Sequence, residues 1–326
     1  SASLVTMALL AAPCLLEIIW AVIGIGFVIA FAVHVCLRDP PVLLEDFIRY
    51  GKSKGGQRAA WMRALDVPKR WFMHFYVVAV VSHVTLFSLT LRALLLGSTF
   101  PGWLESLLVA FGSPTNNFPH GERTKFKMLK KSMELSVVLA QALMVLQVVR
   151  RLAECLFLSV YSNAIMHAVQ YGFGMLYYVM IAFTLLCEGP SIGGKELSVW
   201  QLLAQWRWYH VAGSVMFAWA TLHHHRSHNI LANLRKDKAG RRVVHTRYVV
   251  PHGDWFELVS CPHYLAEILV YVAIAVVLGG VHRTWWVVLF YLIVIQSLEG
   301  RLMHESYRSR FPDYPQHRRA ILPYLL

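Results

Sequence analysis

Charged residues are scarce in this sequence, and most of those present are basic. Only 15% of the 326 residues are Asp, Glu, Lys or Arg, whereas soluble domains contain about 25%. The chain has 31 basic residues against 18 acidic ones. Nucleic-acid-binding proteins can show such an excess, but they gather it on one soluble face. Here the basic residues lie between apolar runs, which argues against a nucleic-acid partner and favours a polytopic membrane protein.

Several short motifs are absent as well. The five cysteines form no C-x-x-C pair and no metal-binding spacing, which argues against a disulfide framework. His224 and His228 lie four residues apart, yet no third ligand accompanies them, so we expect no metal. No G-x-G-x-x-G follows a strand-like segment, which argues against a soluble Rossmann domain. The first apolar run has no basic start and exceeds a signal-peptide core in length, so we expect an anchor helix there.

Long apolar stretches fill most of the chain. Hydrophobic residues make up 57% of it, and the mean hydropathy is +0.48. About 20 apolar residues suffice for one helical crossing of a bilayer. Seven segments are candidate spans: about 4–36, 71–97, 133–149, 164–187, 203–223, 263–281 and 284–300. We therefore predict an all-α fold, a polytopic membrane protein with about seven transmembrane helices in a single domain, 1–326.

The Lys and Arg residues between these spans predict the orientation. Segments 38–70, 150–151, 224–260 and 301–326 hold eight, two, seven and five of them, which makes 22 of 31 on one side. The positive-inside rule assigns that side to the cytosol, so we expect a cytosolic C-terminus. The basic cluster at 123–131 departs from this pattern, and marks either an interfacial helix or a misplaced span.

Polar and ionisable residues gather in the last hundred residues. Such residues are costly inside a bilayer and therefore indicate function. The segment Asn233-Leu234-Arg235-Lys236 begins a basic loop, and the planar fork of arginine suits phosphate oxygens. Plain positive-inside charge or contact with anionic lipid would also account for this loop.

Three pairs of residues have helical spacing. Pro262 suits the first turn of a helix, which places His263 and Glu267 on one face, as a structural pair or a cofactor contact. His304 and Tyr307 follow the last span, where they are either proton donors or part of an interfacial belt. Arg151 and Glu154 have the spacing of a salt bridge, which is either structural or faces a cofactor.

Read in order, these motifs resemble the C-terminal half of the steroid 5-alpha-reductase family, and most closely its polyprenol reductase branch. The resemblance rests on the NLRK segment, on GDWF (253–256), SCPHYLAE (260–267) and FPDYP (311–315), and on the H-x-x-Y pair. It implies NADPH as cofactor, a location in the endoplasmic reticulum membrane, and helices that enclose a cavity for cofactor and lipid. Residues 1–149 would form the substrate side of that cavity, and residues 150–326 the NADPH-binding side.

The resemblance also implies individual roles. Catalytic roles fall to four residues: His304, Tyr307, His74 and Glu267. Cofactor contacts fall to eleven: Arg151, Glu154, His224, His228, Arg235, Lys236, Tyr248, Trp255, His263, Glu267 and Tyr307. Arg235 would meet the phosphates of NADPH, and His263 is a variant, because relatives often have Asn there.

The start of the second span differs from that of steroid-reducing members of the family. Those members have a Gln-Glu pair where His74 and Phe75 stand in this sequence, and the Glu polarises the steroid ketone. Phe75 cannot do so. His74, Phe75 and Tyr76 therefore predict contact with an apolar chain rather than a steroid, with buried aromatic packing as the alternative.

The resemblance therefore implies NADPH-dependent reduction of the alpha-isoprene double bond of a polyprenoid (polyprenal to dolichal, or polyprenol to dolichol), in dolichol synthesis for protein N-glycosylation. Polyprenal is a better direct substrate than polyprenol, because hydride addition to a conjugated aldehyde yields an enolate that a donor can stabilise. Candidate donors are His74, Tyr76, His304 and Tyr307. The alternatives are a 3-oxo-steroid 5-alpha-reductase, a membrane methyltransferase of the isoprenylcysteine carboxyl type, and a non-enzymatic lipid-binding protein. NADPH binding separates the reductases from the other two classes.

Overall fold

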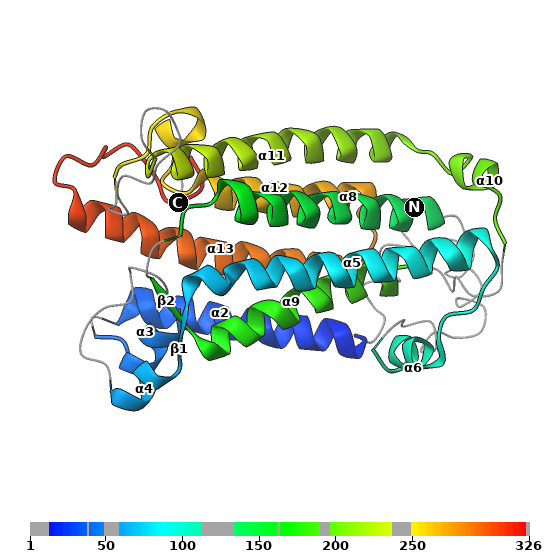
Figure 1. Ribbon diagram of the computed structural model, residues 1–326, viewed down its shortest axis with the longest axis horizontal. Coiled ribbons are helices and arrows are strands. Elements are labelled where there is room, and N and C mark those ends of the chain that lie inside the picture. The colour runs from blue at the N-terminus through cyan, green and yellow to red at the C-terminus, as the bar shows by residue number, and fades with distance from the viewer. Residues whose placement is uncertain are drawn as a thin grey trace.

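A bundle of long helices forms the body of the molecule (Figure 1). The computed structural model describes residues 13–37, 39–48, 59–111, 133–161, 164–189, 196–236 and 249–323. Within these ranges the long helices are α2 (Leu15–Cys36), α5 (Phe72–Leu95), α8 (Glu134–Ala153), α9 (Ala168–Cys187), α11 (Trp208–Asn233), α12 (Pro262–Val277) and α13 (Arg283–Arg310). Each runs antiparallel to the one before it, so the chain passes repeatedly from one end of the bundle to the other.

Each predicted span corresponds to one of these helices. Five of them, in the described part of the chain, are long and apolar enough to cross a membrane: α2, α5, α8, α9 and α13. Helix α12 is apolar but has only 16 residues, and α11 has 26 residues with a polar second half. The helical membrane architecture is therefore confirmed, while the number of seven crossings stays a prediction.

Two helices continue past the ends of the predicted spans. Helix α11 continues to Asn233 rather than ending near 223, and α13 continues to Arg310 rather than ending near 300. The predictions followed the ends of the apolar runs. Polar side chains beyond those ends are partly buried against neighbouring helices and bond to one another, so the helical backbone continues past the apolar sequence.

The span predicted from about 164 begins with a strand of three residues, which leaves the fold predominantly helical. Residues Ile165–His167 form strand β2, which pairs antiparallel with β1 (Asp66–Pro68) in the register Asp66 to His167. Helix α9 begins only after this pair. The His167 ring caps it, because its Nδ1 accepts a hydrogen bond from the Val169 backbone N–H at 3.2 Å.

Short helices close the two ends of the bundle. Helices α3 (Val42–Ile48) and α4 (Ala60–Ala64) lie with the strand pair at the end that also holds the C-terminal segment (Figure 1). Helices α6 (Gly102–Phe111) and α10 (Val199–Leu203) lie at the opposite end. The remaining turns are η2 (Lys69–Trp71), the π-helical η4 (Glu154–Leu158) and η5 (Asp254–Glu257).

Closely packed pairs of helices build the core of the bundle. Helix α11 packs closely on α12, where a Cβ on Gly213 would lie 2.5 Å from Val277 Cγ2. Helix α2 packs on α13, and α5 packs on both α8 and α9. Helices α9 and α13 contact each other much less. The space between them, toward the C-terminal end of the bundle, holds the cavity described next.

Candidate active site

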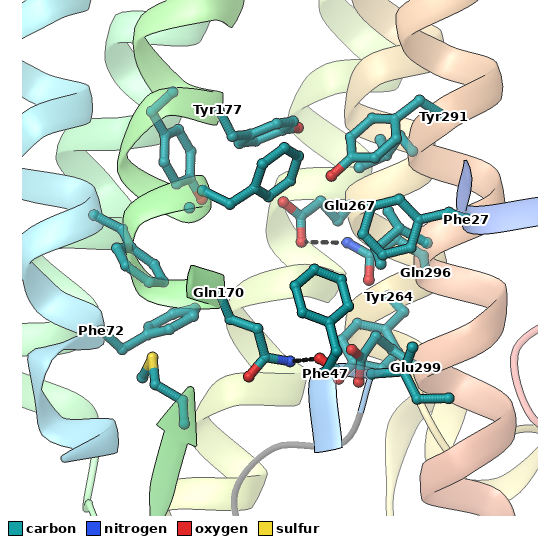
Figure 2. Close-up of a pocket in the computed structure, with 18 of the residues that line it drawn as sticks. Phe27, Phe47, Phe72, Gln170, Tyr177, Tyr264, Glu267, Tyr291, Gln296 and Glu299 are labelled. Atoms are coloured by element: carbon teal, nitrogen blue, oxygen red, sulfur yellow. Dashed lines mark hydrogen bonds between the residues drawn. The ribbon is translucent and has the colours of Figure 1, made fainter. Parts of the chain in front are cut away.

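A cavity of about 230 Å³ lies among α2, α3, α5, α9, α12 and α13 (Figure 2). The lining residues of α5 and α12 lie near the starts of these helices, those of α9 lie in its first half, and those of α13 lie in its middle. The cavity therefore reaches from the middle of the bundle toward the end that holds the C-terminal segment. Its apolar lining is largely aromatic and includes five phenylalanines: Phe27, Phe47, Phe72, Phe75 and Phe173. Such a lining suits an apolar ligand.

Two carboxyl groups and one amide of the cavity lining come from α12 and α13 and form what we call the polar patch: Glu267, Gln296 and Glu299. The Gln296 side-chain amide donates a hydrogen bond to Glu267 Oε2 at 3.0 Å (Figure 2). Glu267 therefore bonds to α13 rather than pairing with His263 on its own helix. An apolar cavity with a few convergent polar groups is typical of a ligand site.

Tyr76 connects the cavity to a group of buried charges. It lines the cavity and is only 4% exposed. The Arg151 guanidinium donates a hydrogen bond from Nε to the Tyr76 hydroxyl oxygen at 3.2 Å and lies 5.0 Å from the centre of the ring. Arg151 also bonds to the Glu154 carboxylate, which confirms the predicted salt bridge.

Two arginines share the single carboxylate of Glu154. Arg150 bonds to it as well, and His225 Nδ1 lies 2.7 Å from its Oε1. Arg150 Nη2 also lies 2.9 Å from His224 Nδ1. These five residues, Arg150, Arg151, Glu154, His224 and His225, form what we call the cationic cluster, between α8 and α11.

The cationic cluster continues toward α12 through two histidines. His228 Nε2 lies 3.1 Å from His224 Nε2, and its ring centre lies 5.6 Å from that of His263. Among the described residues, neither His263 Nδ1 nor Arg150 Nε has a hydrogen-bond partner, although both atoms are buried. Buried polar atoms are normally satisfied, so these two point to a ligand or water that completes them.

His304 and Tyr307 lie elsewhere, within α13 rather than after the last span. Ser260 Oγ lies 2.6 Å from His304 Nδ1 and 2.7 Å from the Tyr314 hydroxyl. The Tyr307 ring stacks on that of Tyr314, with centres 5.5 Å apart. Burial raises the pKa of Tyr314. Among the described lining residues of the cavity, neither His304 nor Tyr307 is present.

The C-terminal segment is fixed beside this group. The backbone N–H groups of Ser260 and Cys261 donate to the carbonyls of Arg319 and Ala320 at 2.7 and 3.0 Å. Tyr314 of the FPDYP segment is thus held against α12 and α13. The C-terminal segment therefore connects the start of α12 to the end of α13.

The other predicted cofactor residues are distributed around the end of α11. Arg235 donates to the Val160 carbonyl, just after η4. Trp255 stacks on His223 with ring centres 4.1 Å apart, on a different face of α11 from His224. Lys236 follows directly in the chain, and Tyr248 lies outside the described residues.

Two of the three predicted substrate residues line the cavity, and the third lies outside its lining. Phe75 and Tyr76 line the cavity, as expected of a substrate contact. His74, in contrast, bonds to the Tyr171 hydroxyl through Nδ1 at 2.8 Å and packs beside Trp71, and it is not among the described lining residues.

Sequence reasoning missed part of the cavity. Gln296 and Glu299 are polar residues at i, i+3 spacing inside the last apolar run, which is the signal that could have identified them. Gln170 also lines the cavity, and its side-chain amide donates to the Phe47 carbonyl. This bond ties α9 to α3.

The sequence matches one family profile and is similar to several known proteins. The sequence profile described as 3-oxo-5-alpha-steroid 4-dehydrogenase matches residues 158–326. A protein of Xenopus tropicalis named polyprenal reductase is 42% identical over 318 residues, which cover 95% of this chain and 99% of that protein. Its human namesake is 41% identical over 319 residues, 95% of each chain, and that of Danio rerio is 39% identical over 317 residues, 96% and 98%.

Proposed function

Since the chain belongs to the 3-oxo-5-alpha-steroid 4-dehydrogenase family, we propose that it is a polyprenal reductase, an oxidoreductase that acts on a CH–CH bond. It saturates the alpha-isoprene double bond of polyprenal in dolichol synthesis for protein N-glycosylation. The support is similarity along nearly the whole chain to proteins named for this activity, together with the cavity of Figure 2.

The single structural observation behind the proposal is the pairing of an aromatic cavity with a polar patch. Isoprene units are apolar and branched, and the five phenylalanines offer them a matching surface. The aldehyde needs polar contacts, which only part of the lining supplies. A polyprenoid has far more isoprene units than about 230 Å³ can hold. The cavity therefore takes the aldehyde end, and the rest of the chain extends out of it.

We infer that the reductant is NADPH, and the chemistry of the donor set fits it. Two arginines face one carboxylate in the cationic cluster, so the cluster has an excess of positive charge for an anionic cofactor. The buried His263 Nδ1 and Arg150 Nε, which have no partner among the described residues, add donors or acceptors. We propose that this cluster, with His228, Arg235 and Lys236, holds the cofactor, with Tyr248 and Trp255 completing the set from the following loop. When bound, NADPH supplies a hydride.

The residues of this chain favour an aldehyde over a steroid ketone or an alcohol. Phe75 stands where steroid-reducing relatives have a polarising Glu, so a ketone placed there would lose its donor. An isolated double bond of polyprenol has no group to take negative charge, whereas the enal of polyprenal has its carbonyl oxygen. We propose that the Glu267 carboxyl group, which bonds to the Gln296 amide, orients the bound substrate and cofactor beside the reacting carbons.

His304 and Tyr307 are proposed to act from the cofactor side rather than from the cavity. They lie on α13 beyond Glu299, beside the C-terminal segment. Their hydrogen-bonded group with Ser260 and Tyr314 can position a bound cofactor, or pass a proton, without touching the lipid.

We place the protein in the endoplasmic reticulum membrane with its C-terminus in the cytosol. Several apolar helices support a multi-pass protein. The described parts of the basic segments lie together at the C-terminal end of the bundle (Figure 1), as the positive-inside rule requires of the cytosolic side.

The deciding experiment is mass spectrometry of the purified protein with NADPH and one of three substrates: polyprenal, polyprenol or testosterone. We expect direct formation of the saturated aldehyde from polyprenal, and little product from the other two. Saturable steroid reduction without polyprenal turnover would contradict the proposal. Quenching of tryptophan fluorescence by S-adenosylmethionine but not by NADPH would indicate a methyltransferase instead.

A further inference from the structure

We propose that the Tyr76 hydroxyl is the group that binds the aldehyde oxygen and stabilises the enolate, and that Arg151 and Glu154 are its positioning residues. The inference rests on the proposed function and names the donor within that cavity. It concerns a side chain adjacent to the position where steroid-reducing relatives have their polarising Glu.

The reaction needs one such donor. A hydride from NADPH adds to the β-carbon of the enal, and the electrons of the double bond move onto the carbonyl oxygen. The resulting enolate then takes a proton from water at its α-carbon, which gives the saturated aldehyde and the oxidised cofactor. A preorganised hydrogen-bond donor at the oxygen stabilises the negative charge that develops in the hydride step.

Five other polar side chains of the cavity suit this task less well. The carboxylates of Glu267 and Glu299 would repel a negative oxygen when ionised. The amides of Gln296 and Gln170 already donate to Glu267 and to the Phe47 carbonyl. The Tyr177 hydroxyl donates to the Tyr271 hydroxyl at 2.7 Å.

At Tyr76 the neighbouring cation bonds to the hydroxyl oxygen and not to the hydroxyl hydrogen. Its hydroxyl oxygen accepts the hydrogen bond from Arg151 Nε at 3.2 Å. Arginine has no acceptor, so it cannot take the hydroxyl hydrogen. The Tyr178 hydroxyl also bonds to Tyr76, so a bound aldehyde oxygen competes only with another hydroxyl for that hydrogen. Tyr76 thus combines two features, a hydroxyl in the cavity lining and a bond from that hydroxyl to a cation.

The neighbouring charge strengthens the donor. As the hydroxyl hydrogen shifts toward the enolate oxygen, negative charge grows on the phenol oxygen, and the Arg151 guanidinium beside it stabilises that charge. Tyr76, Arg151 and Glu154 are 4%, 6% and 4% exposed, so little water screens these contacts. The Glu154 carboxylate fixes Arg151 in turn, which keeps the donor in place before the substrate arrives.

The test compares full-length wild type and Tyr76→Phe in lipid nanodiscs, with polyprenal and NADPH. The substitution removes one donor and keeps the ring. Loss of one oxyanion donor typically costs about 10²–10³ in kcat, and we expect a loss of that size with little change in KM. With NADPH deuterated at the transferred position, the kinetic isotope effect should stay or increase, because hydride transfer becomes slower. NADPH affinity, measured by tryptophan fluorescence, should be unchanged.

Tyr271→Phe is the matched control. It also removes a buried tyrosine hydroxyl, but from a side chain outside the cavity lining whose partner is Tyr177. We expect its kcat to stay close to that of wild type.

Two further variants separate chemistry from structure. A 3-fluorotyrosine at position 76 is more acidic than tyrosine and should change kcat at constant KM, which a merely structural hydroxyl would not do. Arg151→Lys keeps the charge but loses the Nε donor, and should reduce kcat and weaken the response to fluorination.

The inference is overturned if wild type reduces polyprenal and Tyr76→Phe does so at a similar kcat. It is also overturned if Tyr76→Phe loses activity only in proportion to its loss of NADPH-binding sites, with an unchanged isotope effect. The folded fraction of the variant would then turn over as fast as wild type, and the hydroxyl would be needed only for folding. A wild type that leaves polyprenal unreduced would overturn the proposed function, and this inference with it.

Discussion

Gly174 is the position where a single methyl group should change the shape of the cavity. A Cβ on Gly174 would lie 2.8 Å from Phe75 Cζ and 2.9 Å from Phe75 Cε2, in the lining of the cavity. Carbon atoms pack at about 3.5–4.0 Å, so the Phe75 ring must move by roughly 0.7 Å or more in Gly174→Ala. Since Phe75 is 6% exposed and packed on other rings, such a shift meets resistance.

The expected change in the free energy of unfolding of Gly174→Ala is the difference between two effects. Overpacking typically costs about 1–3 kcal/mol, and replacing a helical Gly by Ala gains up to about 1 kcal/mol. Gly172 lies two residues away on the same helix, and a methyl group added there would meet no atom of the described residues within 4 Å, so Gly172→Ala should show only the gain. We therefore expect Gly174→Ala to be less stable than Gly172→Ala by about 1–3 kcal/mol.

The assay combines thermal unfolding in detergent with kcat/KM for polyprenal. Gly174→Ala should lose part of its kcat/KM, because the displaced Phe75 ring narrows the cavity, whereas Gly172→Ala should not. Phe75→Leu in the Gly174→Ala background makes room for the methyl group and should recover both stability and activity. Equal stability and activity of the two alanine variants would refute the reasoning, as would a double variant that recovers neither.

Four further expectations concern the cofactor, the polar patch and the topology. Arg235→Ala should weaken NADPH binding by roughly 1.5–3 kcal/mol and NADH binding much less, as measured by fluorescence titration, and an equal loss for both would mean that Arg235 does not contact the 2′-phosphate. Glu267→Gln should keep the melting temperature and lower kcat, while a destabilised variant with normal kinetics would make the residue structural. His304→Ala should lower the rate by about 10²–10⁴ if His304 is a general acid, and a lower melting temperature with normal kinetics would show that it only supports Ser260. A glycosylation acceptor inserted within 224–260 should stay unmodified, and its modification in cells would overturn the cytosolic placement.

The sequence alone was sufficient for the features that depend on local spacing. Apolar runs of about 20 residues must become helices in a bilayer, because the backbone has no other partner there, and a helix lies at each predicted span. The i, i+3 spacing of Arg151 and Glu154 already predicted their salt bridge. The motifs near the C-terminus also indicated the family that the comparisons confirm.

The tertiary structure decided which polar residues meet. Sequence reasoning grouped His74 with Phe75 and Tyr76, yet only the latter two line the cavity. It linked Glu267 with His263, whereas the Glu267 carboxylate bonds to Gln296 on α13. The contact between Arg151 and Tyr76 joins residues 75 positions apart in the chain, and no local pattern contains it. Periodicity tells which face of a helix is polar, but the partner of that face depends on how whole helices pack, and packing is fixed by side-chain shapes distant in sequence.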